Sequence, residues 1–158
     1  MRGDAKVVVV SGPRGLNAIA DNSPTAGQSS TLEVVVLFSG ALPTLAALRM
    51  AGQLGQNLDV RVKLVTFQTV PYELELTRPT IATRWIEERL CALASKAPVE
   101  VRVDIILCRD PGWALRQVLK PDSLVVIGTR RRWWRTQGQR LAGRLRQDGH
   151  QVILAYVQ

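Results

Sequence analysis

The sequence has little of what most catalytic sites need. Its 158 residues include one histidine, His150, and two cysteines, Cys91 and Cys108. A single histidine without an acidic cluster beside it argues against a histidine-based triad and against a zinc site. Two isolated cysteines provide no disulfide framework, so we expect free thiols in a reducing compartment. We therefore expect that the protein is not an enzyme and that it has neither catalytic residues nor metal ligands.

Aromatic residues and long apolar runs are also scarce. Phe, Trp and Tyr make up 5% of the chain, whereas 46% of it is hydrophobic, which is typical of a compact α/β domain. No apolar run reaches the ~18 residues of a membrane-spanning helix. Val7–Val10 is too short for the core of a signal peptide. We therefore expect a cytoplasmic protein.

Acidic residues are few, and they are absent from one region. The chain has 21 Lys and Arg against 13 Asp and Glu, a net charge of +8. Seven of the positive charges lie close together, with no acid between them: Arg130, Arg131, Arg132, Arg135, Arg140, Arg144 and Arg146. The rest of the chain is then close to neutral. Such a basic region attracts anions, from nucleotide phosphates to nucleic acids and acidic surfaces.

Residues 1–31 differ from the remainder of the chain. Val7–Val10 has the composition of a short strand, and Asp21–Thr31 is rich in Asn, Ser, Pro, Thr and Gly, as in a flexible linker. One interpretation is an N-terminal arm without regular structure. The other is a strand added to a sheet edge, either its own or a partner's.

Residues 32–158 alternate between strand and helix patterns, as expected of one domain. Apolar strand patterns occupy Val34–Phe38, Val60–Phe67, Val99–Leu107, Leu124–Ile127 and Val152–Val157. Helical patterns lie between them, and Trp85 and Trp113 fall on their apolar stripes, where we expect core residues. This alternation predicts right-handed crossovers and a five-stranded parallel open sheet, with helices on both faces in a three-layer α/β fold.

The stretch Ser123–Trp134 combines the clearest strand with the clearest change of charge. Its strand ends at Gly128 and Thr129, and ligands of open α/β sheets sit beyond such ends. Arg130, Arg131, Arg132, Trp133, Trp134 and Arg135 follow. Three interpretations remain open: a solvated loop whose tryptophans pack on the protein, an anion site built from arginine forks, or a contact for nucleic acid or an acidic surface.

An ordered series of local patterns resembles the universal stress protein family, whose fold is of the adenine nucleotide alpha hydrolase-like type. The patterns are Val-Val-Val-Leu-Phe-Ser-Gly at 34–40, Arg-Asp-Pro at 109–111, Leu-Val-Val-Ile-Gly-Thr-Arg at 124–130 and the last strand. The resemblance extends over Glu33–Gln158, about four-fifths of the chain. The resemblance implies a five-stranded parallel sheet, a ligand crevice near Asp110, and dimers formed through the last strand.

The sequence also departs from the family at its glycine motif. Nucleotide-binding members have Gly, two residues, Gly, nine residues, then Gly-Ser or Gly-Thr. Gly128 matches the first position, but Arg131 stands at the second, and Leu141-Ala142 stand at the closing pair. The family's aspartate at the end of the first strand aligns with Ser39. The resemblance therefore implies a backbone phosphate cradle that is largely lost.

These observations predict a non-enzymatic, stress-related regulatory or interaction module with lost or altered ATP binding. Two alternatives are an adenine-nucleotide sensor that uses arginines in place of glycines, and a polyanion-binding module. Candidate ligand residues are Ser39, Gly40, Asp110, Gly128, Thr129, Arg130 and Arg131. Candidate anion or partner contacts are Arg132, Trp133, Trp134 and Arg135. We expect no bound cofactor under the first interpretation, ATP or another adenine nucleotide under the second, and a homodimer through Val152, Ile153, Leu154 and Tyr156.

Overall fold

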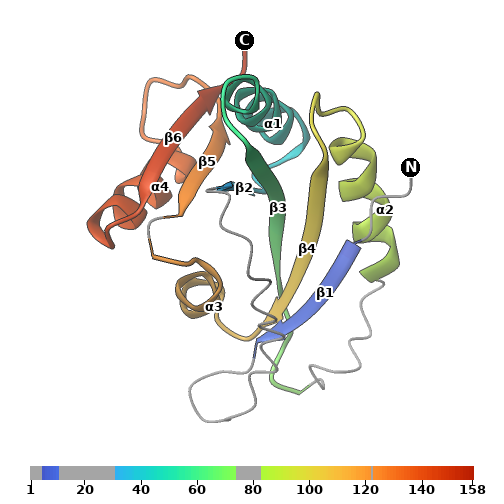
Figure 1. The fold of residues 1–158 in the computed structure, drawn as a ribbon. Coiled ribbons are helices and arrows are strands. Elements are labelled where there is room, and N and C mark those ends of the chain that lie inside the picture. The colour runs from blue at the N-terminus through green and yellow to red at the C-terminus, as the bar shows by residue number, and fades with distance from the viewer. Residues whose placement is uncertain (1–4, 11–30, 74–82, 122) are drawn as a thin grey trace.

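The structure is a six-stranded parallel sheet between two pairs of helices (Figure 1). The computed structural model describes residues 5–10, 31–73, 83–121 and 123–158. The strands are β1 (Ala5–Val10), β2 (Leu32–Leu37), β3 (Val60–Thr69), β4 (Val101–Cys108), β5 (Leu124–Thr129) and β6 (Gln151–Tyr156). The helices are α1 (Ala41–Gly55), α2 (Thr83–Ala94), α3 (Pro111–Val118) and α4 (Gln137–Gln147).

The strand order is β1-β4-β3-β2-β5-β6, and all neighbours pair in parallel. This confirms the predicted three-layer α/β fold, including the five strands expected from their apolar runs. The sixth strand is β1, which pairs with β4 from Ala5–Val103 to Val10–Cys108. The N-terminal region thus adds a strand to the edge of the chain's own sheet, as in the second of the two interpretations. Of the linker predicted over Asp21–Thr31, residues 21–30 lie outside the described residues.

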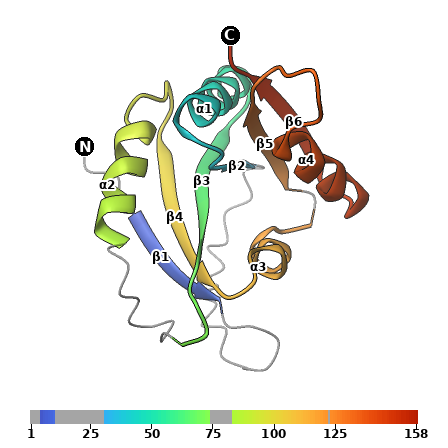
Figure 2. The ribbon, with the colours of Figure 1, turned by 180° about the vertical axis from the view of Figure 1, so that it is seen from behind.

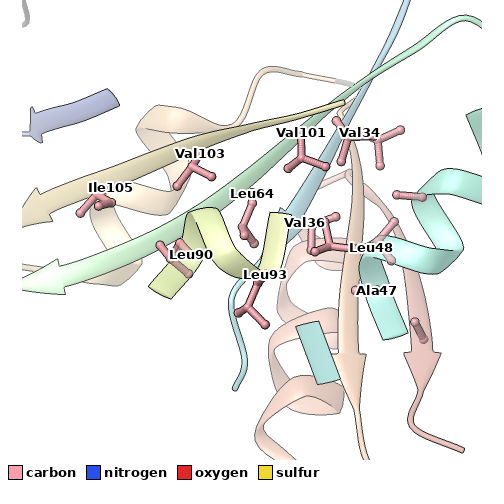
Figure 3. Close-up of a cluster of buried hydrophobic side chains, with 14 of the residues drawn as sticks. Val34, Val36, Ala47, Leu48, Leu64, Leu90, Leu93, Val101, Val103 and Ile105 are labelled. Atoms are coloured by element: carbon pink, nitrogen blue, oxygen red, sulfur yellow. The ribbon is translucent and has the colours of Figure 1, made fainter. Parts of the chain in front are cut away.

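One face of the sheet is covered by α1 and α2. Alternate residues of the strands, including Val34, Val36, Leu64, Val103 and Ile105, point at these helices and are fully buried. They pack against Ala47 and Leu48 of α1 and against Leu90 and Leu93 of α2 (Figure 3). The near-continuous apolar strands follow from this arrangement, since a parallel sheet has helices on both faces.

The other face carries α3 and α4. Val35, Leu37, Val65, Ile106, Val125 and Ile127 form its core, together with Ala114 and Leu115 of α3 and Ala142 and Leu145 of α4. Two views of the molecule place α2 and β1 at one end of the sheet and α4 and β6 at the other (Figures 1 and 2).

The prediction that Trp85 lies in the core is wrong. Its side chain is 61% exposed, and the Arg89 guanidinium stacks over its ring at 5.4 Å. The buried stripe of α2 runs through Leu90 and Leu93, with Ile86 half-buried, so Trp85 lies one residue outside it. Trp113, on α3, is half-buried.

Candidate functional site

A cleft of about 900 Å³ opens at the carboxyl ends of β2 and β5. From β2 the chain proceeds through α1 to β3 on one side, whereas β5 leads through α4 to β6 on the other. The cleft therefore lies at the switch point of the sheet, where open α/β folds bind their ligands. Its walls are residues 37–43 of β2 and α1, residues 127–130 of β5, and parts of the following loop and α4, namely Arg132, Trp134, Arg135, Thr136, Gln137, Gly138, Arg140 and Leu141.

The first wall ends in the N-terminus of α1. Gly40 precedes the helix with a φ of 105°, a left-handed conformation that favours glycine, and it provides no side-chain cap. The N–H groups of Ala41 and Leu42 have no partner within the helix, as in the first turn of any α-helix. The buried Thr44 hydroxyl accepts a hydrogen bond from the Ser39 N–H at 3.1 Å, which fixes the turn. The helix thus presents backbone donors and the positive end of its dipole to the cleft.

Gly128 is required by packing on α1. A Cβ atom at this position would lie 1.7 Å from the carbonyl oxygen of Pro43, so no side chain fits. The Ser39 hydroxyl donates to the Gly128 carbonyl at 2.8 Å, joining the ends of β2 and β5. Two of the predicted ligand residues therefore hold the floor of the cleft together, whether or not a ligand is present.

A second helix N-terminus enters the cleft from the opposite face of the sheet. Thr136 caps α4: its hydroxyl accepts from the Gln139 N–H at 3.3 Å, and the Gln139 side chain accepts from the Thr136 N–H at 3.0 Å. The Thr129 and Thr136 hydroxyls share a hydrogen bond of 2.7 Å. Gly138 follows in the first turn, with Thr129 so close that a Cβ would sit 3.3 Å from it.

The helical pattern of residues 137–147 predicts α4 correctly, but sequence reasoning missed that the start of this helix lines the cleft. Counting from the family motif places the closing pair at 141–142, which in the structure falls inside α4. The signal was nevertheless present as Thr136-x-x-Gln139, the pattern of a capping box. Because α4 begins at Gln137, Thr136 and Gly138 reach the cleft instead.

The lining of the cleft is rich in arginine. Arg130, Arg132, Arg135 and Arg140 all line it and are exposed to solvent. The lining residues that the structure describes include no aspartate or glutamate. Arg140 was not among the predicted site residues, although it belongs to the basic run. The cleft thus combines four guanidinium groups with two helix N-termini, an arrangement that favours anions.

Two predicted ligand residues lie outside the cleft. The Arg131 guanidinium stacks over the ring of Tyr156 at 5.4 Å, whereas its neighbours Arg130 and Arg132 line the cleft. Asp110 caps α3, where one carboxylate oxygen accepts from the N–H groups of Gly112 at 2.9 Å and Trp113 at 3.2 Å. Both side chains are engaged in the fold, and the structure does not bring them to the ligand crevice.

The two tryptophans of the loop are exposed. Trp133 is 99% accessible, and Trp134, at 65%, forms part of the cleft wall. The interpretation in which both pack on the protein is therefore wrong. Exposed indoles of this size beside arginines are typical of contact surfaces.

The predicted dimer strand is the edge strand β6. Val152, Ile153 and Leu154 are half-buried, and Tyr156 is 37% exposed. Only β5 pairs with this strand within the described part of the chain.

Neither cysteine thiol lines the cleft. Burial raises the pKa of both thiols, Cys91 on α2 and Cys108 at the end of β4, and the nearby carboxylates Glu87 and Asp110 raise them further. Across residues 5–10, 31–73, 83–121 and 123–158, no group of three His, Cys, Asp or Glu side chains could hold a metal ion. No helix in these same ranges is long and apolar enough to cross a membrane.

Comparison with known proteins supports the fold. A crystal structure of a universal stress protein in complex with cAMP superimposes with a TM-score of 0.52, at 18% identity, over 82% of this chain and 100% of that chain. No family model and no curated protein matches the sequence. The chain therefore shares the fold of the universal stress proteins over the part that the resemblance covers.

Proposed function

We propose that this protein is a non-enzymatic regulatory module that binds a phosphorylated small molecule in the cleft. The observation that carries the proposal is the set of four arginines, Arg130, Arg132, Arg135 and Arg140, gathered around two helix N-termini. The stress-related role expected from the resemblance is part of the same proposal.

The chemistry of the cleft suits a phosphate group. Guanidinium groups form bidentate hydrogen bonds to phosphate oxygens, and they keep their charge at all physiological pH values. The free N–H groups in the first turns of α1 and α4 are further donors of the kind that bind phosphate. Arginines thus replace the glycine-lined backbone cradle, which Arg131, Leu141 and Ala142 no longer provide.

An adenine nucleotide is the first ligand to test. The similar universal stress protein was crystallised with cAMP, a nucleotide with a single phosphate. In this chain Trp134 lies in the cleft wall beside the arginines, where its indole offers a flat apolar surface to a base. The cleft, at about 900 Å³, is within the size range of small-molecule sites.

We also propose that the protein does not hydrolyse the ligand that it binds in the cleft. The only hydroxyls among the lining residues belong to Ser39, Thr129 and Thr136, and each is engaged in a hydrogen bond. None of these hydroxyls has a histidine or carboxylate partner to activate it as a nucleophile. Incubation with ATP and analysis of the nucleotide by chromatography tests this point: hydrolysis that Ser39→Ala abolishes would overturn it.

Isothermal titration calorimetry tests ligand binding. The titrations use cAMP, AMP, ADP and ATP at low and at physiological ionic strength. We expect binding that weakens about tenfold in Arg132→Gln plus Arg135→Gln, because each charged hydrogen bond contributes ~1.5–3 kcal/mol when formed and less at an exposed site. Arg116→Gln on α3, which does not line the cleft, is the matched control and should bind like the wild type. The absence of heat with all four nucleotides at millimolar concentration would contradict the proposal.

We also propose that two copies associate through β6. This strand is an apolar sheet edge, and an unpaired edge favours pairing with a second strand. Sedimentation equilibrium at micromolar concentration should give twice the mass of 17.4 kDa. Ile153→Lys should produce a monomer, whereas a wild-type monomer would remove this part of the proposal.

A further inference from the structure

The cleft opens onto a larger basic and aromatic surface. We define the Arg/Trp surface as residues 130–135 together with Arg140 and Arg144 of α4, all of them exposed. No acidic residue occurs anywhere between Ser123 and Gln147. A mononucleotide in the cleft would leave Trp133 and Arg144 without any role in binding.

The two tryptophans face different environments. Trp134 belongs to the wall of the cleft, while Trp133, 99% exposed, stands outside it. A fully exposed indole contributes nothing to the core, and its apolar surface in water is unfavourable. Two successive indoles, one inside and one outside the cleft, match two neighbouring flat groups of one extended ligand.

Helix α4 continues the row of positive charges. Arg140 lines the cleft, and Arg144, four residues later, lies one turn further along the same side of the helix. Four residues of α4 rise about 6 Å, so Arg140 and Arg144 are separated by about two stacked nucleotides at ~3.4 Å each. The row can therefore follow the phosphates of a short strand that leaves the cleft.

We propose that the Arg/Trp surface binds single-stranded nucleic acid, with one nucleotide in the cleft, bases stacked on Trp133 and Trp134, and the following phosphates on Arg140 and Arg144. This inference rests on the proposed function, since it makes the phosphate site of the cleft the anchor of the strand. Stacking on aromatic rings combined with a basic track is how proteins hold single strands without reading their sequence.

The shape of the site favours a single strand over other polyanions. Four of the arginines line a concave cleft, which the flat surface of an acidic bilayer does not enter. A duplex keeps its base faces stacked inside, so it offers Trp133 nothing to stack on. The Arg131 guanidinium, held over Tyr156, extends the positive field toward β6 without entering the cleft.

Fluorescence anisotropy with the full chain tests the inference. The probes are fluorescein-labelled twelve-nucleotide oligo(A) as RNA and as DNA, the corresponding duplex, and, in a flotation assay, vesicles of phosphatidylcholine with phosphatidylserine. We expect tight binding of the single strands and weaker binding of the duplex and vesicles. The logarithm of affinity should fall linearly with the logarithm of salt concentration, at a slope of about −0.7 for each phosphate contacted.

The matched variants are two exposed tryptophans. Trp133→Ala should weaken binding of the single strands about 5-fold or more, because one base loses the indole on which it stacks. It should leave AMP binding unchanged, since Trp133 does not line the cleft. Trp85→Ala on α2, whose indole is 61% exposed at the far end of the sheet, should change neither. Both variants alter exposed side chains, and thermal melting checks that they remain folded.

The outcomes separate this inference from the proposed function. If AMP binds but the oligonucleotides bind no better, the inference fails and the proposed function stands. If neither the oligonucleotides nor any of the four nucleotides bind, both fail. Equal affinity for duplex and single strand, or no effect of Trp133→Ala, would reduce the surface to a general polyanion patch and overturn the inference. Preferential binding to vesicles would overturn it in favour of an acidic membrane.

Discussion

A single backbone contact decides what residue 128 can be. The Gly128→Ala variant would place a methyl group within 1.7 Å of the Pro43 carbonyl oxygen, and backbone cannot move aside as a flexible side chain can. We expect the free energy of unfolding to fall by about 3 kcal/mol or more. Urea denaturation followed by circular dichroism measures it.

Gly143 is the matched control for this substitution. It lies inside α4, and a Cβ there would meet nothing within 4 Å. Gly143→Ala should therefore stabilise the protein by about 0.5–1 kcal/mol, the usual gain of alanine over glycine in a helix. Equal effects of the two substitutions would contradict the packing described for α1 on β5.

The two thiols should react slowly in the native protein. Burial, aided by Glu87 and Asp110, raises the pKa of Cys91 and Cys108, so less thiolate is present at neutral pH than for a free cysteine. We expect modification by a disulfide reagent at pH 7 to be about tenfold or more below that of the unfolded protein. Cys108, the more buried of the two, should be the slower. Fast modification of either thiol in the native protein would contradict this expectation, and the variants Cys91→Ser and Cys108→Ser identify which thiol reacts.

At the scale of elements, the N-terminus of α4 depends on Thr136. Its hydroxyl caps the helix and also bonds to Thr129 of β5, so Thr136→Ala removes both interactions. Loss of an N-cap costs ~0.5–2 kcal/mol, and we expect a destabilisation of about 1–2 kcal/mol. Thr136→Ser keeps the hydroxyl and should restore most of the loss in chemical denaturation. If Thr136→Ser is as unstable as Thr136→Ala, the methyl group of Thr136 stabilises the helix start and its hydroxyl does not.

A chain of charges links β2, β3, β4 and the turn after α3. The carboxylate oxygens of Glu33 lie 3.4 Å from Lys63 Nζ and 3.3 Å from Lys120 Nζ. Lys63 Nζ also lies 3.8 Å from a carboxylate oxygen of the buried Asp104. Burial by itself raises the pKa of Glu33, but the charges and hydrogen bonds of the two lysines outweigh it and lower the pKa below the ordinary value of 4.5.

This lowered pKa makes the stability dependent on pH. A carboxylate whose folded pKa is depressed stabilises the fold above its unfolded pKa, and this contribution is lost as the pH falls through the folded value. Glu33→Gln should therefore be less stable than the wild type at pH 7, by on the order of 1 kcal/mol. The difference should shrink below pH 4.5 and vanish in strong acid. Thermal melting of both proteins between pH 3 and 7 measures it; a constant difference would contradict the ion pairs.

Most elements could be predicted because their cause is local. Each apolar run between turn residues became a strand, and Asp110-Pro111 began α3 as its capping pattern indicates. Trp85 could not be placed, since one residue of rotation separates the buried stripe of α2 from its exposed side. Likewise, Val7–Val10 carried no sign of its partner, because pairing with β4 bridges almost a hundred residues of chain.

The position of the cleft could be predicted from the sequence, but the set of side chains that line it could not. Strand ends predict the edge where ligands bind, and Ser39, Gly128 and Thr129 do meet there. Side-chain direction in an irregular loop follows no period. Nothing in the run of arginines showed that Arg130 and Arg132 face the cleft while Arg131 stacks on Tyr156.

For the whole molecule, the uneven charge should make stability depend on salt. Most of the net charge of +8 is concentrated near α4, where arginines repel one another in the folded state. Raising sodium chloride from 20 mM to 0.5 M shortens the screening length from about 20 Å to about 4 Å. We expect the melting temperature to rise by roughly 2–4 °C, which corresponds to about 1 kcal/mol for a chain of this size.

Phosphate provides the comparison for this salt effect. At equal ionic strength it should raise the melting temperature further than chloride, because it also occupies the cleft and stabilises the folded state by mass action. The extra rise should disappear in Arg132→Gln plus Arg135→Gln. A fall of the melting temperature with salt would show that ion pairs such as Glu33–Lys63 dominate over repulsion.

The strand order has a consequence for how the chain folds as it is synthesised. The first and the last strands form the two edges of the sheet, with β2, β3, β4 and β5 between them. β1 leaves the ribosome before its partner β4, which begins at residue 101, so its run of valines stays unpaired while about ninety residues are synthesised. At the ~5–20 residues per second of protein synthesis, this wait lasts about 5–20 seconds. During that time a chaperone that binds short apolar strands has its opportunity at β1.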